Sequence, residues 1–271
     1  MRISKFILSL SIVLTLFTSN ILAQEALPED QESTAQEERV LNPVDTVKEF
    51  YRLLREKKYL EGFRMSVYRD AIEPLTPQEL KELEPDFEVT FAQIPETVKA
   101  VGSQSNGVTA TVFIKSTDNP KDPTADEVSL IQIKDRWIVG DTETLELVKG
   151  LGRRFFPEIR IRAHEDAAQI YMERYIGAQK LYSDANKGLY GSIEDLVNAT
   201  FWPVSLKNGE IEGYKFTIEL GKDKRDFSVH GEPLNYNKSG RVSFYADLKG
   251  VYRLDTGGQI FRGPQSLGNS K

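Results

Sequence analysis

Residues 163–182 read AHEDAAQIYMERYIGAQKLY, and this stretch decides the fold expected for the second half of the chain. Its apolar residues recur at intervals of three and four, which places them on one face of an α-helix. They are Ala163, Ala167, Ile170, Tyr171, Ile176, Ala178 and Tyr182, while Glu165, Asp166, Glu173 and Arg174 lie off the stripe. The pattern predicts a long helix over 158–185 that buries Ile170, Ile176 and Tyr182 against a sheet.

The residues after this helix have the pattern of turns and strands. Asn186-Lys187-Gly188 is typical of a helix end, and Ser192 with Asp195 predicts a short helix over 193–199. Strands are expected at 214–220, 226–232, 241–247 and 251–254, separated by glycines. A second domain over 153–271 is therefore expected to be α+β, with the long helix packed on a small antiparallel sheet.

Four phrases follow one another in this half: Ile176-Gly-Ala-Gln-Lys-Leu-Tyr182, Gly188-Leu-Tyr-Gly-Ser-Ile-Glu-Asp-Leu196, Gly213-Tyr-Lys-Phe-Thr217 and Phe244-Tyr-Ala-Asp-Leu-Lys-Gly-Val-Tyr-Arg253. In this order, over 158–262, they resemble the globular half of type IV pilins and type II secretion pseudopilins. That family carries a processing site directly before an apolar stem that continues into the long helix, whereas here the helix is entered through the charged stretch Glu158-Ile-Arg-Ile-Arg162. The resemblance implies a pilin-like head used as an interaction module.

Some pseudopilins hold calcium in a C-terminal loop, so the resemblance makes Asp247 and Asp255 candidate calcium ligands. Calcium takes several oxygen ligands, and these two carboxylates lie beside glycines in expected turns. Aspartate and glycine are also the ordinary residues of hairpin turns. No metal is therefore assigned from the sequence.

The first half of the chain begins with helices. Asn42 with Pro43 predicts the start of one helix, and Thr76 with Glu79 has the spacing of a capping box for another, which is expected to stop before Pro85. A short helical stretch over 60–68 lies between them. From residue 86 the apolar period changes to two, and strands are expected at 86–91, 97–102, 108–115, 127–134 and 136–140.

The last two strands form the hairpin Ser129-Leu-Ile-Gln-Ile-Lys-Asp-Arg-Trp-Ile-Val-Gly-Asp141. With helices followed by a curved antiparallel sheet, it resembles the NTF2-like α+β cone over 42–150, within an expected domain 42–152. In that family the sheet surrounds an active site, a ligand pocket or filled core. The resemblance implies that aromatic residues line the cone, namely Tyr51, Phe63, Phe91, Phe113 and Trp137. Whether they fill the core or border a pocket stays open, and Asp70, Asp86 and Glu88 are the carboxylates considered for an active site there.

The N-terminal residues 1–23 have the order of a secretory signal peptide. Arg2 and Lys5 precede an apolar run that is too short for the roughly 20 residues of a spanning helix, and Ala23 is the expected cleavage position. Residues 24–41 are acidic with almost no large apolar side chains, as in a flexible linker. The sequence thus predicts a periplasmic or secreted protein, with no membrane span after cleavage.

Composition restricts the partners and cross-links that are available. The chain has no cysteine, so it forms no disulfide and carries no lipoprotein anchor. Its net charge of −6, with both signs interspersed, excludes nucleic acid as the expected partner. One basic cluster stands out, Arg153, Arg154, Arg160 and Arg162, and it is expected to be a solvated helix start.

Few residues suggest chemistry. The two histidines, His164 and His230, are far apart in sequence, and a zinc site would need one or both of them with carboxylates. Ser228 shares a strand face with His230, but Gly-x-Ser-x-Gly and phosphate-loop motifs are absent. No catalytic residue and no cofactor is assigned.

The leading hypothesis is an exported, non-catalytic envelope protein that binds other envelope proteins, associated with a secretion or pilus system. The alternative is a small-molecule-binding or hydrolytic NTF2-like domain with an accessory pilin-like module. An open cavity with a carboxylate at its base would favour the alternative. The sequence leaves the oligomeric state and the identity of any partner open.

Overall fold

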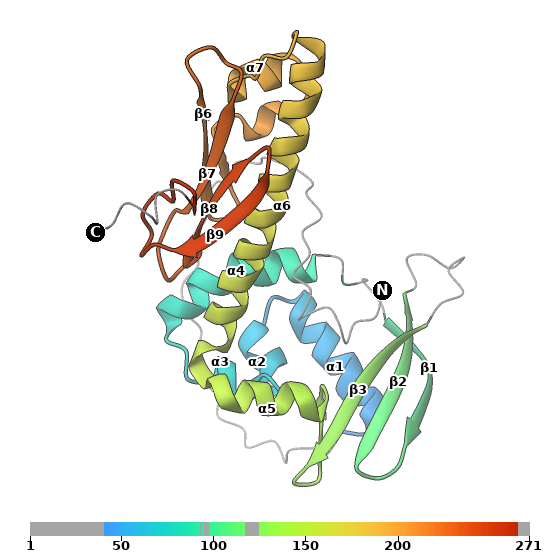
Figure 1. The fold of residues 1–271 in the computed structure, drawn as a ribbon. Helices are drawn as coiled ribbons and strands as arrows, with labels where there is room; N and C mark the ends of the chain where they lie inside the picture. Colours follow the sequence, from blue (N-terminus) through green and yellow to red (C-terminus); the bar gives the residue numbers. More distant parts are fainter. Residues whose placement is uncertain (1–40, 93, 95–97, 117–124, 265–271) are drawn as a thin grey trace, which may run out of the picture. The chain divides into compact units, whose positions relative to one another are not determined.

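The computed structural model describes residues 41–92, 94, 98–116 and 125–264 (Figure 1). The chain divides into two compact units, Met1–Arg153 and Arg154–Lys271, within the 3-10 turn Gly152–Arg154. Both units combine helices with an antiparallel sheet, so the predicted α+β class is confirmed. The expected signal peptide and nearly all of the expected linker lie outside the described residues. Among the described helices, none has the length and apolar character needed to cross a membrane.

Unit 1 contains α1 (Pro43–Arg55), α2 (Tyr59–Arg64), α3 (Arg69–Ile72), α4 (Pro77–Phe91) and α5 (Thr142–Leu151), with strands β1 (Val98–Ser105), β2 (Thr109–Ser116), β3 (Asp126–Ile133) and β4 (Arg136–Val139). The four strands pair in sequence order, each antiparallel to the next. α1 packs on this sheet. The inward positions of β2 are Ala110, Val112 and Ile114, all buried.

Helix starts in unit 1 follow local capping. The side chain of Asn42 accepts the N–H of Asp45 at 2.9 Å, and Pro43 occupies the first turn, so the predicted start of α1 is confirmed. α5 was not anticipated from the sequence. Asp141 accepts the N–H of Thr144 at 2.7 Å, which is the cap that begins α5 directly after the hairpin.

The strand predicted at 86–91 is wrong, because α4 continues through Pro85 to Phe91. Residues four apart share a face in both a helix and a strand, so Phe87 and Phe91 match either period. The structure resolves the ambiguity through Leu83 and Phe87, which are buried, while Val89 is 73% exposed. Proline has no N–H to donate to the preceding turn, yet here the aromatic contacts of Phe87 with Phe63, at 5.1 Å between ring centroids, hold the helix beyond it.

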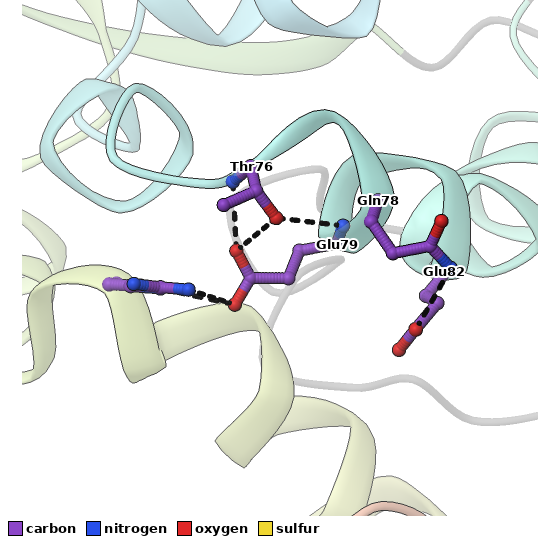
Figure 2. Close-up of polar contacts among 5 residues, drawn as sticks. Thr76, Gln78, Glu79 and Glu82 are labelled. Carbon is purple, nitrogen blue, oxygen red and sulfur yellow. Dashed lines mark hydrogen bonds and ion pairs between the residues drawn. The ribbon is translucent and has the colours of Figure 1, made fainter.

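The capping box of α4 connects two segments of unit 1. Figure 2 shows Thr76 and Glu79 bonded reciprocally: Thr76 donates its N–H to Glu79 Oε2 at 2.8 Å, and Glu79 donates its N–H to Thr76 Oγ1 at 3.3 Å. The second carboxylate oxygen of Glu79 accepts Arg153 Nη2 at 2.6 Å. The predicted box is therefore confirmed, and it also ties α4 to the residue that follows α5.

The charge of Glu79 makes part of the stability of unit 1 dependent on pH. Bonds from the Thr76 N–H, from Arg153 and from the Thr76 hydroxyl lower the pKa of Glu79 from 4.5 to about 2. Because the folded-state pKa is lowered, this stabilisation is present above pH 4.5 and is lost as the pH falls toward 2.

Glu79→Gln removes this titrating carboxylate. The thermal unfolding midpoint of the variant, measured by circular dichroism, should therefore fall less steeply than that of the unmodified protein as the pH is lowered over this range. An unchanged pH profile in the variant would contradict the assignment.

Unit 2 contains α6 (Phe155–Ala185), α7 (Ile193–Asn198), a 3-10 turn (Val204–Leu206) and strands β5 (Glu210–Ile211), β6 (Tyr214–Leu220), β7 (Phe227–Pro233), β8 (Val242–Asp247) and β9 (Gly250–Asp255). The strands form an antiparallel meander in the order β5-β6-β7-β8-β9. α6 packs on β7, β8 and β9, and Figure 1 shows the sheet lying along this helix. The predicted α7 is confirmed, with Ser192 and Asp195 forming its capping box.

One face of the sheet and one face of α6 form the core of unit 2. The helix contributes Ala168, Tyr171, Met172, Tyr175 and Ala178, and the strands contribute Tyr214, Phe216, Phe227, Val229, Phe244 and Ala246. The predicted burial of Ile170 is wrong, since it is 49% exposed, and Ile176 and Tyr182 are only partly buried. At about 100° per residue, Ile170 lies roughly opposite Ala168 on the helix, so both cannot face the sheet.

The identity of the buried face predicts unequal effects of truncation on α6. Met172→Ala should lower the free energy of unfolding by about 2 to 5 kcal/mol, because Met172 is fully buried among core side chains. Ile170→Ala should change it by less than about 0.5 kcal/mol, because much of this side chain is solvated. Urea titration of the full chain compares the two. Equal losses of unfolding free energy in the two variants would contradict the assignment of Met172 to the buried face and Ile170 to the exposed face.

Candidate functional site on helix α6

The five aromatic residues proposed for a pocket in unit 1 do not converge on one site. Tyr51 and Phe63 are buried, and the ring of Phe91 lies 5.9 Å from that of Phe63, so these residues belong to the interior. Phe113 alternates on β2 with the buried Val112 and Ile114. Its side chain therefore lies on the other face of the sheet.

The fifth aromatic residue, Trp137, is half-buried and shares its sheet face with the interior. It pairs with Gln132, two residues from the buried pair Leu130 and Val139. Interior filling thus accounts for Tyr51, Phe63 and Phe91. Only the hydroxyl of Tyr51 is left over: it is buried with no hydrogen-bond partner among the described residues. Burial, and then the charge of Asp126, raise the pKa of this phenol.

The carboxylates considered for catalysis or for calcium lie apart. Asp70 and Glu88 are exposed, and Glu88 pairs with Lys57 at 2.5 Å, while Asp86 is half-buried. Across the described part of the chain, no group of three or more acidic or histidine side chains is placed to hold a metal ion.

Asp247 and Asp255 lie at opposite ends of the β8–β9 hairpin. Asp247 pairs with Gly250 at the turn and Asp255 pairs with Val242, so five residues, or about 17 Å, separate them along the strand. Asp247 accepts the N–H of Lys249 at 2.7 Å and Asp255 that of Gly257 at 3.0 Å. Both carboxylates stabilise turns, and they do not form one calcium site.

Arg153 of the basic cluster and His164 have structural partners. Arg153 bonds Glu79, as described above. His164 Nδ1 lies 3.1 Å from the carbonyl oxygen of Ser239. The ring closely approaches Gly213, whose φ is 74° and where an added Cβ would lie 2.6 Å from Nδ1. Glycine is thus required there, and His164 packs the loop against α6.

The charged start of α6 is fixed to its own sheet by Arg241. The guanidinium of Arg241 donates from Nη2 and Nη1 to the two oxygens of Glu158 at 2.7 and 2.8 Å, and its backbone N–H donates to Glu165 at 2.8 Å. The hydrogen bond from Arg241 lowers the pKa of Glu158. A bidentate guanidinium–carboxylate pair has defined geometry. It holds the first turns of α6 against the residues that begin β8.

The outward face of α6 carries a narrow apolar stripe, which we call the α6 stripe: Ile170, Gly177 and Leu181. Ile170 is 49% and Leu181 is 56% exposed, and Gly177 is exposed with open space above it. Their spacings of seven and four residues place them within about 40° of one another, over about 16 Å of helix. Exposed charged residues border the stripe, namely Asp166, Glu173, Arg174, Lys180 and Asp184.

The stripe has the composition of a helix-packing surface. Two branched aliphatic side chains flank a glycine, at which a partner backbone can approach closely. Charges of both signs at the borders can fix the register of a partner, as at the edges of a helical seam. Of these three residues, the sequence analysis placed only Ile170 on a face, and it placed it on the buried one, because the helix is apolar on two sides.

Behind this face, an aromatic stack is packed between α6 and the segment after α7. The rings of Tyr175 and Trp202 lie parallel, with centroids 3.9 Å apart and planes at 19°. The Tyr175 hydroxyl and Trp202 Nε1 are buried and have no hydrogen-bond partner among the described residues. Burial raises the pKa of Tyr175, so the phenol stays neutral. The two rings contribute apolar contact to the core. The hydroxyl and the indole N–H add no hydrogen bond with the described residues.

The contribution of a buried tyrosine hydroxyl to stability can be compared at two positions, Tyr175 and Tyr214. Tyr175→Phe should leave the free energy of unfolding unchanged or raise it, because it removes a buried hydroxyl without a partner. Tyr214→Phe should lower it by about 0.5 to 1.5 kcal/mol, because that hydroxyl donates to the Val242 carbonyl at 2.8 Å. Chemical denaturation of both variants is the measurement. A comparable loss in Tyr175→Phe would show that its hydroxyl has a bound partner, such as an internal water.

Comparison with known proteins returns no match of any of three kinds. No protein-family model matches the chain. No curated protein and no solved structure is significantly similar to it. The assignment of a role to each unit therefore rests on its own residues and geometry.

Proposed function

We propose that this chain is an exported protein whose second unit is a pilin-like head that binds another envelope protein, in a secretion or pilus system. The observation that carries the proposal is the α6 stripe: apolar side chains held outward on a helix whose other face is fully occupied by its own sheet. Ile170 and Leu181 have no role in the core, and their exposure costs solvation. A partner helix seated on Gly177 would remove that exposed area.

The start of α6 supports a head that acts without a filament stem. Where pilins continue into an apolar stem, this helix carries charged residues from Glu158 onward, and Glu158 and Glu165 are bonded to Arg241 within the same unit. A helix whose first turns are bound to its own sheet is not free to pack in a filament core. Unit 1, proposed to be NTF2-like, then serves as an additional domain of the same exported protein.

A second candidate function, ligand binding in unit 1, rests on Tyr51. Its buried hydroxyl lacks a partner among the described residues and is influenced by the charge of Asp126. A buried polar atom without a partner is the kind of group that a water or ligand satisfies. The carboxylates considered there are exposed or half-buried, so binding is better supported than hydrolysis.

The stripe is tested by a double variant, Ile170→Glu with Leu181→Glu, in the full mature chain. Both side chains are largely solvated, so the free energy of unfolding should change by less than about 0.5 kcal/mol for each. A photo-crosslinking residue placed at Gly177 should join the protein to a secretion or pilus component in envelope extracts. The double variant should lose that product.

The control for each substitution is Gln169→Glu, which adds one negative charge beside the stripe on an exposed position of the same helix. It should retain the cross-linked product. If the double variant retains it too, or if Gly177 yields no product while exposed positions elsewhere do, the stripe is not the binding surface.

A further inference from the structure

The outer face of the sheet in unit 2 brings a serine hydroxyl to a buried histidine. On β7 the residues Phe227, Val229 and Gly231 face α6, so Ser228, His230 and Glu232 face the other way. Ser228 Oγ lies 3.1 Å from His230 Nε2, within hydrogen-bond distance. Ser228 is half-buried, whereas His230 is 2% exposed. Ser228 is therefore partly open to solvent, while most of the imidazole is covered.

The other ring nitrogen determines what Nε2 can do. His230 Nδ1 lies 2.9 Å from the carbonyl oxygen of Phe261. A carbonyl only accepts hydrogen bonds, so Nδ1 carries the proton and donates it. In the neutral imidazole Nε2 is then an acceptor, and Ser228 donates its hydroxyl proton to it. This tautomer is the one that a general base for a serine hydroxyl requires.

Charged residues from the neighbouring strand and the C-terminal segment complete the surroundings. Glu219 is the direct cross-strand neighbour of Ser228 and places Oε2 3.6 Å from His230 Nε2. The other oxygen of Glu219 lies 3.5 Å from Arg262 Nη1, so a cation borders the exposed side of the site. Glu232 lies two residues along the same face, and burial raises its pKa. Tyr245 packs against the imidazole with ring centroids 5.5 Å apart.

We propose that Ser228 is a base-activated nucleophile that accepts acyl groups from small esters, with His230 as its general base. Ser228 Oγ forms a bond to the ester carbonyl carbon while its proton moves to His230 Nε2. The bond from that carbon to the leaving oxygen then breaks, and Nε2 returns the proton to the departing alcohol. Water reverses the sequence: it gives a proton to Nε2, bonds to the acyl carbon and releases Ser228 Oγ, which regains the proton.

Glu219 and the Phe261 carbonyl act as positioning groups in this scheme. The carbonyl fixes the tautomer through Nδ1, and Glu219 faces the nitrogen that becomes positively charged. The negative carboxylate favours the imidazolium that forms during the attack. A nucleophile, a base and a group that orients the base are the parts that covalent catalysis by serine needs. This proposal is independent of the α6 stripe, because the stripe lies on the face of α6 that points away from the sheet.

The test uses the full mature chain and p-nitrophenyl acetate as the probe. Intact mass and peptide mapping should locate one acetyl group on Ser228. Ser228→Ala should lose this label. His230→Gln should slow its formation by about 100-fold, within the usual range for loss of a general base. Ser129→Ala removes another half-buried strand serine, whose cross-strand neighbour is Thr111, and should leave the rate unchanged.

A second measurement keeps the test decisive if His230→Gln does not fold. Urea-unfolded protein should lose the selective reaction at Ser228. The proposal is overturned if Ser228 is not acetylated, if it reacts equally fast after unfolding, or if a folded His230→Gln variant reacts at the unmodified rate.

Discussion

The five-stranded sheet of unit 2 has two faces, and α6 can cover only one of them. Strand alternation sends Phe216, Val229 and Phe244 toward the helix, so the residues between them must be satisfied elsewhere. The C-terminal segment supplies this second cover. Ser243 donates to the Gln259 carbonyl at 2.7 Å, and His230 donates to that of Phe261. Because the chain has no cysteine, both covers depend on non-covalent contacts alone.

α6 is apolar on two sides, and only one of them meets the sheet. A helix that covers a sheet needs one buried stripe, and Ala168, Met172 and Tyr175 provide it. Ile170 and Leu181 add nothing to that contact, since the helical repeat turns them outward. Core packing and any docking through the outer stripe therefore depend on different residues of one element. Substitutions on the outer side can change binding while leaving the fold intact.

Local signals in the sequence located most helix starts but not every helix or face. Asn42, Thr76 and Ser192 were recognised because a cap is formed by residues three apart. Residues 86–91 were misassigned because the spacing of Phe87 and Phe91 satisfies both periods, and only packing against Phe63 decides between them. Ile170 was assigned to the core because a composition that is apolar on two sides does not reveal which side meets the sheet.

The pairing of Ser228 with His230 shows where sequence reasoning ends. Their spacing of two on a strand was visible, but the state of the imidazole was not, because it is set by Phe261, 31 residues further along the chain. A buried histidine must satisfy both nitrogens. The carbonyl of Phe261 takes the Nδ1 proton, which leaves Nε2 to accept from Ser228. One hydrogen bond thus holds the C-terminal segment on the sheet and also sets the tautomer that the proposed nucleophile requires, so the stability of this face and its proposed chemistry cannot be separated.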